Sequence, residues 1–192
     1  METLKAINSR RSVRKYTKQE VSKELIAELL EAATWAPSAM NLQPWYFVAI
    51  TNENDKNFVL EVMQKVAVSM KNELEERFRD YPQVVAQTLS FTKSLGSASA
   101  YILVFEHGEY AASKQDAITQ SIAAAMQNFC LAAASNELGT CWMCAPINAG
   151  FGENFRQKFA PSNGKMVAML TLGYPNETPN APKRKDNRYK II

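Results

Sequence analysis

The chain has little of the chemistry that several large protein classes require. It contains one histidine, His107, and three cysteines among its 192 residues. That inventory is too small for a disulfide framework or a complete Cys/His zinc site. An odd number of cysteines favours a reduced, cytoplasmic protein. The net charge is only +3, with basic residues spread along the chain, so we expect no nucleic acid partner.

Long hydrophobic runs are also missing. The most apolar stretch, 118–134, is interrupted by Thr119, Gln120 and further polar residues, so it does not read as a membrane span. The first residues have no apolar core of a secretory signal. We therefore expect no membrane contact. The length suits one domain covering residues 1–192 and is short for two.

Hydrophobic periodicity predicts helices that alternate with a few strands. Expected helices cover 2–9, 22–35, 58–78, 82–94, 113–136 and 151–159, and expected strands cover 45–51, 100–106, 141–144 and 166–173. This order predicts an α+β fold. Residues 58–94 carry no chemical signature and are candidates for a lid or a substrate-shaping insertion.

Several local expectations follow from the same pattern. Leu4 and Ile7 should face inward, and the strand from Trp45 should be covered on both faces. Ser113 and Asp116 have the spacing of a capping box at the start of the long helix, and Gly139 lies where its C-terminal cap is expected.

The segment Ser9 to Tyr16 reads Ser-Arg-Arg-Ser-Val-Arg-Lys-Tyr. In an extended chain Arg10, Ser12 and Arg14 point the same way, because strand side chains alternate with period two. Two guanidinium groups flanking a hydroxyl suit a phosphate or a similar planar anion.

A second polar segment, Ala36 to Trp45, reads Ala-Pro-Ser-Ala-Met-Asn-Leu-Gln-Pro-Trp. Its prolines indicate a rigid loop that presents Ser38, Asn41 and Gln43 at the start of an apolar strand. The two guanidinium groups, together with the amide side chains of this loop, favour a ligand with a phosphate at one end and a hydrogen-bonding heterocycle at the other.

Four motifs in this order resemble the nitroreductase family of FMN-dependent oxidoreductases. They are Arg10 to Arg14, Ala36 to Trp45, the alanine-rich helix running into Leu-Gly-Thr-Cys-Trp (138–142), and Leu-Gly-Tyr-Pro (172–175) followed by Arg184-Lys185. The resemblance implies an antiparallel-dominated mixed sheet wrapped by helices. It also implies an intertwined homodimer whose C-terminal segment reaches the partner.

The resemblance also implies site residues and an activity. Arg10, Ser12 and Arg184 would hold the phosphate and ribityl chain of FMN, with Arg11 beside them. Arg14 would lie near N1 and O2 of the flavin. Pro37, Ser38 and Asn41 would contact FMN from the loop, with Ser38 coming from the other subunit. The backbone around Cys144, Ala145 and Pro146 would approach the ring. NADH or NADPH would reduce FMN, and a nitroaromatic, quinone or related small planar acceptor would then take the electrons in ping-pong order.

Alternative readings stay open at this stage. The chain fits a specialised relative, such as a dehalogenase, a desaturase or a flavin-degrading enzyme, or a flavin-binding protein with little turnover. Cys141 and Cys144 form a C-x-x-C pair that suggests a redox thiol module, although we expect ordinary core cysteines. We likewise expect Trp45 and Trp142 in the core and His107 in an exposed loop.

Overall fold

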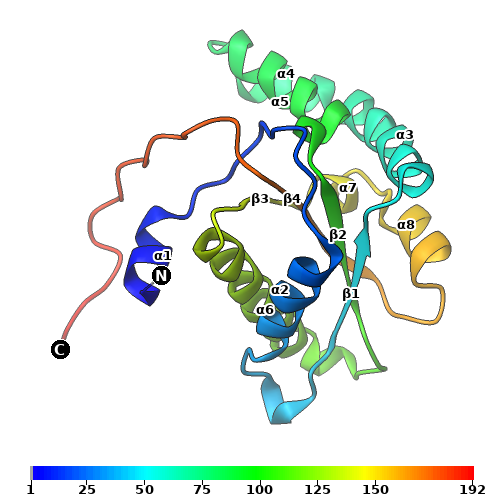
Figure 1. Cartoon of the computed structure of the whole chain (residues 1–192), viewed down its shortest axis with the longest axis vertical. Coiled ribbons are helices and arrows are strands. Elements are labelled where there is room, and N and C mark those ends of the chain that lie inside the picture. Colours follow the sequence, from blue (N-terminus) through cyan, green and yellow to red (C-terminus); the bar gives the residue numbers. More distant parts are fainter. Residues whose placement is uncertain (1) are drawn as a thin grey trace.

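The computed structural model describes residues 2–192 and contains one four-stranded sheet (Figure 1). Its strands are β1 (Trp45–Ile50), β2 (Ala100–Glu106), β3 (Gly139–Met143) and β4 (Met166–Gly173), in the order β1-β2-β4-β3. All three strand pairs are antiparallel, and the one parallel contact is an isolated bridge between Ser12 and Thr140. The predicted strands 100–106 and 166–173 are confirmed.

Eight α-helices surround the sheet in the described part of the chain, residues 2–192. They are α1 (Thr3–Ser9), α2 (Lys23–Thr34), α3 (Glu53–Ser69), α4 (Lys71–Arg77), α5 (Pro82–Ser94), α6 (Gln115–Ser135), α7 (Ala145–Asn148) and α8 (Gly152–Phe159). The region 58–78, which we expect to form one or two helices, forms two, and the first begins earlier because Asn52 caps it by accepting the Asp55 N–H at 2.9 Å. The helices and the antiparallel sheet confirm the α+β prediction.

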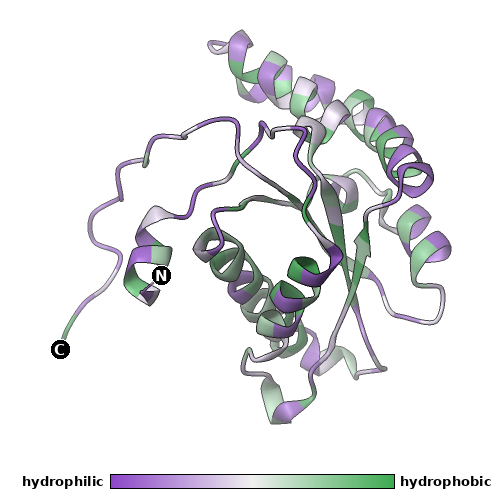
Figure 2. Cartoon of the chain, viewed as in Figure 1, coloured by the Kyte–Doolittle hydropathy of each residue, from purple (hydrophilic) through white to green (hydrophobic). Residues whose placement is uncertain are grey.

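The two faces of the sheet bury different helices. Helices α2 and α6 cover one face, where they pack on Ile102 and Val104, whereas α3 and α8 lie on the other face against Leu103 and Phe105 (Figure 1). Because strand residues alternate, the continuous apolar run of β2 supplies both cores at once. Hydrophobic colour accordingly concentrates in the middle of Figure 2, and the outer helices carry polar stripes.

The strand β1 lies at the edge of the sheet, so the expectation that it is covered on both faces is wrong. Tyr46 is exposed and residues 47–49 are only half-buried. An edge strand keeps one row of backbone groups unpaired, and its apolar composition alone does not reveal this position. The fully buried strands are β2 and, nearly so, β4.

Both predicted caps of the long helix α6 need correction, although the helix ends at Ser135, next to the predicted end at 136. Ser113 lies inside a preceding 3₁₀ turn (Ala112–Lys114) and provides no cap, because its backbone is already helical there. At the other end, Glu137 takes the left-handed conformation (φ 60°), and the Leu138 N–H donates to Ala133 O at 2.9 Å. Glu137 therefore terminates the helix in the manner expected of glycine, and Gly139 instead begins β3.

The two ends of the chain expose apolar side chains. In α1 only Ala6 is buried, whereas Leu4 is 72% exposed and Ile7 is also exposed, contrary to the expectation that they face inward. Tyr189, Ile191 and Ile192 are exposed at the end of the tail. Within residues 2–192, no helix has the length and apolar character needed to cross a bilayer.

Candidate functional site

The basic segment from Arg10 to Tyr16 is pinned against the sheet by its own backbone. The Val13 N–H donates to Thr140 O at 2.9 Å, and the Tyr16 N–H donates to Gly96 O at 3.2 Å. The hydroxyl of Tyr16 donates to Val13 O at 2.6 Å and lies 2.6 Å from Thr171 Oγ1. These contacts hold the segment extended, as the alternation of Arg10, Ser12 and Arg14 requires.

Two glycines make this close approach possible. A β-carbon at Gly139 would lie 2.7–2.9 Å from the side chain of Val13. One at Gly96, where φ is +64°, would collide with the carbonyl oxygen of Arg14. Because both contacts are tighter than carbon atoms tolerate, only glycine lets the basic segment lie this close to β3 and to the turn after α5.

Two adjoining clefts open on either side of the basic segment. The first, here called the Arg14 cleft, has a volume of about 750 Å³ and is lined by Arg14, by Lys15 and by the polar face of α5. The second, the Arg10–Arg11 cleft, has a volume of about 420 Å³ and also contacts the end of α6. Glu177 and Pro179 line both clefts, so the tail after β4 forms the divide between them.

The guanidinium groups of the segment form no salt bridge with any carboxylate among the described residues. Within residues 2–192, neither Arg10, Arg11 nor Arg14 forms an ion pair within 4 Å. Arg11 donates to Asn8 O and Arg10 O at 2.8 and 2.7 Å and so closes the end of α1. The Arg14 guanidinium lies 5.9 Å from the centre of the Phe91 ring. Arg10 and Arg14 thus bring positive charge to the clefts, and this charge suits an anionic ligand.

The polar loop before β1 is held in a strained shape. Met40, Asn41 and Gln43 all have positive φ angles, of 52°, 55° and 47°. Ser38 Oγ accepts the Gln43 N–H at 3.0 Å, and the Ala39 N–H donates to the buried Ser121 Oγ at 3.1 Å. Left-handed non-glycine residues cost of order 1–3 kcal/mol each and often mark functional positions.

One chain does not bring the predicted site residues together. In Figure 1 the loop that carries Pro37, Ser38 and Asn41 lies beyond the lower ends of α2 and α6, whereas the basic segment passes over the opposite end of the sheet. Arg184 is exposed on the extended tail. Within a single chain, therefore, Arg10 and Arg11 line one cleft and Arg14 lines the other, whereas the intervening Ser12 lines neither.

Cys144 and Ala145 line a third, smaller cleft of about 280 Å³ with Met70 and Arg77 of the α3–α4 region. Cys141 is buried, and burial raises the pKa of its thiol, whereas Cys144 is exposed. All three cysteines are free thiols. The expectation that Cys141 and Cys144 are core cysteines is thus confirmed for Cys141 and is wrong for Cys144.

The expectation that Trp45 and Trp142 lie in the core is confirmed for Trp45 and is wrong for Trp142. Trp45 is buried, but Trp142 is 37% exposed because β3 is the other edge strand of the sheet. Its neighbours Cys141 and Met143 point into the core, so the strand alternates between buried and exposed residues.

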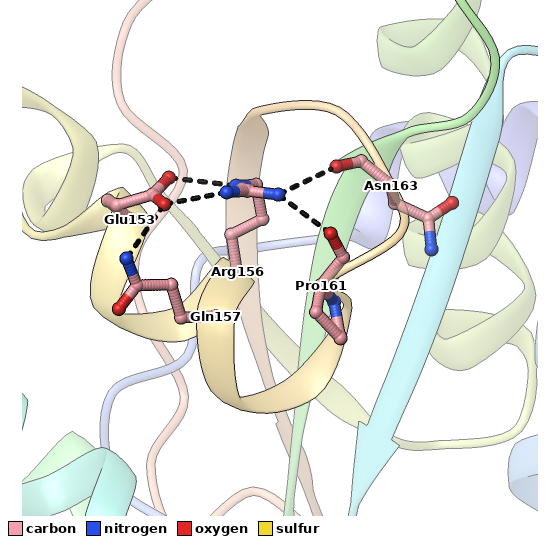
Figure 3. A network of polar contacts seen from close by, with 5 residues as sticks. All are labelled: Glu153, Arg156, Gln157, Pro161 and Asn163. Carbon is pink, nitrogen blue, oxygen red and sulfur yellow. Dashed lines mark hydrogen bonds and ion pairs between the residues drawn. The ribbon is translucent and has the colours of Figure 1, made fainter.

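His107 belongs to a structural network, and its predicted exposure is confirmed. Arg156 donates to both oxygens of Glu153 at 2.8 and 2.7 Å and to the carbonyl oxygens of Pro161 and Asn163 (Figure 3). This hydrogen bonding from Arg156 lowers the pKa of the Glu153 carboxyl. The network fixes the turn after α8, and there Asn163 Oδ1 lies 2.8 Å from His107 Nδ1.

Sequence reasoning missed two residues that shape the site. Glu177 Oε1 accepts the backbone N–H of Arg14 at 2.5 Å, although the two residues are 163 positions apart. Ser121 anchors the polar loop from within α6. A serine inside an apolar helix is a usable signal for such an anchor. A glutamate in a polar tail carries no comparable signal.

Comparison with known proteins places these features in a family. A model of the nitroreductase family matches residues 7–174. A protein of Bacillus subtilis named as an NAD(P)H nitroreductase is 28% identical over 182 residues, which are 93% of this chain and 87% of the relative. The iodotyrosine deiodinase of Hydra vulgaris is 29% identical over 188 residues, covering 94% of this chain and 67% of the relative.

A solved structure agrees with this assignment. A nitroreductase-type protein of Desulfovibrio desulfuricans, crystallised in complex with FMN, superposes with a TM-score of 0.74 at 25% identity and covers 100% of this chain and 98% of its own. The match to the family extends through the basic segment, the polar loop and β4. The chain belongs to the nitroreductase family, as the order of its four motifs predicts.

Proposed function

We propose that this protein is an FMN-dependent oxidoreductase that passes hydride equivalents from NADH or NADPH to a small planar acceptor, such as a nitroaromatic or a quinone. Membership of the family and the FMN-bound relative support this assignment. One structural observation carries it: Arg10 and Arg14 line adjoining clefts without an ion-pair partner among residues 2–192.

The residues around the clefts fit the chemistry of FMN. Arg10 and Ser12 offer a cation and a hydroxyl, which are the donors that a phosphate needs. Bound FMN supplies the redox chemistry, because its ring accepts a hydride and releases the electrons to a second substrate. Arg14 contributes a fixed positive charge that favours the negative charge gained on reduction. Cys144 and Ala145 present backbone at the third cleft, where we place the edge of the flavin.

We propose that the complete site requires a second copy of the chain. The loop that carries Pro37, Ser38 and Asn41 lies at the opposite end of the sheet from the basic segment of its own chain (Figure 1), so we assign it to the site of a second chain. Exposed apolar side chains at Trp35 and Met40 flank that loop, and α1 and the tail expose further ones. A homodimer would cover these surfaces and bring the loop, with Ser38, to the partner's clefts. Arg184 would reach the phosphate from the tail.

We further propose that residues 1–192 form one FMN-binding domain that works in the cytoplasm. The free thiols of Cys130, Cys141 and Cys144 are consistent with a reducing compartment.

The activity is tested by steady-state kinetics. Protein reconstituted with FMN is assayed with NADH or NADPH and a quinone or nitroaromatic at several concentrations of both substrates. Ping-pong transfer predicts parallel lines in double-reciprocal plots. Tight FMN binding without reduction by either nicotinamide would instead indicate a flavin-binding protein.

The likeness to a deiodinase over nearly the whole chain favours one second candidate, reductive dehalogenation of an aromatic substrate. Release of iodide from iodotyrosine under reducing conditions would support it. Turnover of quinones without iodide release would exclude it.

A further inference from the structure

Glu177 is the carboxylate that the two clefts share. It is half-buried, it lines both the Arg14 cleft and the Arg10–Arg11 cleft, and it makes no ion pair within residues 2–192. Its Oε1 atom accepts the Arg14 backbone N–H at 2.5 Å. A carboxylate beside a basic segment would ordinarily pair with a guanidinium, so its bond to the backbone requires an explanation.

The backbone fixes Glu177 in this place. The Thr17 N–H donates to Tyr174 O at 2.9 Å, and the Asn176 N–H donates to Lys15 O at 2.8 Å. These bonds form a short antiparallel pairing between the basic segment and the chain that leaves β4. Glu177 follows directly after this pairing, so its side chain starts from an anchored position rather than from the exposed tail.

The charges of Glu177 and Arg14 act on the same volume in opposite directions. Burial is the main cause that raises the pKa of the Tyr16 hydroxyl and of the Cys141 thiol. Glu177 adds to both rises, whereas Arg14 opposes them. Arg14 and Glu177 also both line the Arg14 cleft, so a ligand there lies beside both charges and their effects on it oppose each other.

We propose that Glu177 is a positioning residue that orients the Arg14 peptide and offsets part of the Arg14 charge, and that it thereby sets the midpoint potential of bound FMN. The inference rests on the proposed function, because it needs FMN at the Arg14 cleft. A cofactor that becomes more negative on reduction is harder to reduce beside a carboxylate. Glu177 thus holds the potential down, which favours transfer of electrons to the acceptor.

The test separates the charge of Glu177 from its hydrogen bond. Glu177→Gln keeps an oxygen that can accept the Arg14 N–H and removes the charge. We expect its midpoint potential to rise, by about 30 mV for a tenfold change in the two-electron equilibrium. Glu20→Gln is the matched control, because Glu20 is an exposed carboxylate that lines none of the three clefts. Its potential should equal that of the wild type.

If Glu177→Gln does not fold, a second pair of variants tests the effect of the charge. Glu177→Asn and Glu177→Asp share a shorter side chain and differ in charge, so the Asn variant should have the higher potential. A purely structural role would lower the melting temperature of the apoprotein and leave all the potentials equal, which would overturn the inference. If the wild-type protein binds no FMN, the proposed function itself fails. Normal FMN binding and reduction with unchanged potentials would refute only the role of Glu177.

Discussion

Gly96 lies so close to the Arg14 peptide that a β-carbon on it would collide with the Arg14 carbonyl oxygen. The same glycine accepts the Tyr16 N–H, so its backbone contacts the basic segment at two points. The direction of Arg14 therefore depends on a residue in the turn after α5, about 80 positions along the chain.

Gly96→Ala should displace the Arg14 peptide as well as strain the turn. We expect a loss of stability of about 1–3 kcal/mol and weaker FMN binding. Gly150→Ala is the matched control: its φ is also positive, at 81°, but no atom lies within 4 Å of the added carbon. Chemical denaturation and FMN titration of both variants measure the difference. Equal behaviour of the two variants would show that the contact with Arg14 is unimportant.

Arg10 should hold the phosphate of FMN. Arg10→Ala should weaken FMN binding by about 1.5–3 kcal/mol, since a charged hydrogen bond is lost. Arg184→Ala should act in the same direction if the tail reaches the site in a dimer. Titration of the apoproteins by flavin fluorescence measures the affinity. Arg188→Ala, which removes another exposed cation of the tail, serves as the control. Wild-type affinity in Arg10→Ala would contradict the phosphate assignment.

Arg14 should raise the midpoint potential of FMN by its charge. Arg14→Gln keeps a long polar side chain and removes that charge, so the potential should fall. Lys15→Gln removes the neighbouring exposed cation on the same cleft and should shift the potential less. Potentiometric titration with reference dyes compares the variants. An Arg14→Gln potential no lower than that of Lys15→Gln would argue against a cation at the flavin.

Stability should fall in alkaline solution. Burial raises the pKa of Tyr101 to about 12 and raises that of Tyr16 further, from an ordinary value of 10.0. The folded state keeps protons that the unfolded state releases, so the stability is fully present below pH 10.0 and is lost as the pH rises through about 12. The buried thiols of Cys130 and Cys141 add a loss of the same sign above 9.0.

Denaturation as a function of pH isolates the tyrosine contribution. Tyr101→Phe should show a shallower alkaline loss than the wild type, because one of the retained protons is absent. Tyr189→Phe changes an exposed tyrosine of the tail and should leave the slope unchanged. Identical slopes for Tyr101→Phe and the wild type would refute this linkage.

Glu137 occupies a left-handed position that favours glycine. Glu137→Gly should therefore stabilise the protein by about 0.5–1 kcal/mol. Asn136→Gly, one residue earlier at φ −101°, should destabilise it. Thermal unfolding of the two variants compares them directly. Destabilisation by Glu137→Gly would mean that the glutamate side chain contributes more than its backbone strain costs.

The sequence predicts those helices and strands whose residues carry a strong signal within the element itself. The strands 100–106 and 166–173 and the helix 82–94 have the predicted bounds, because continuous apolar runs and a proline at the first helical position are strong local signals. Apolar composition could not distinguish an edge strand from a central one, so the environments of β1 and of Trp142 were not predictable.

The candidate site is likewise predictable only in part, because some of its contacts leave a local pattern in the sequence and others do not. The alternation of Arg10, Ser12 and Arg14 is visible in the sequence, and the structure places Arg10 and Arg14 at the two clefts but Ser12 at neither. The bond between Glu177 and the Arg14 peptide joins positions that no periodicity connects. Leu4 and Ile7 have helical apolar spacing, but the sequence does not show whether their own chain or another molecule covers them.

The most direct test of the whole account is the visible spectrum of the purified protein, recorded before and after anaerobic addition of NADH or NADPH. The account predicts flavin bands, present at purification or after addition of FMN, that bleach with at least one of the two nicotinamides. Absence of any bound flavin after addition of FMN would contradict it.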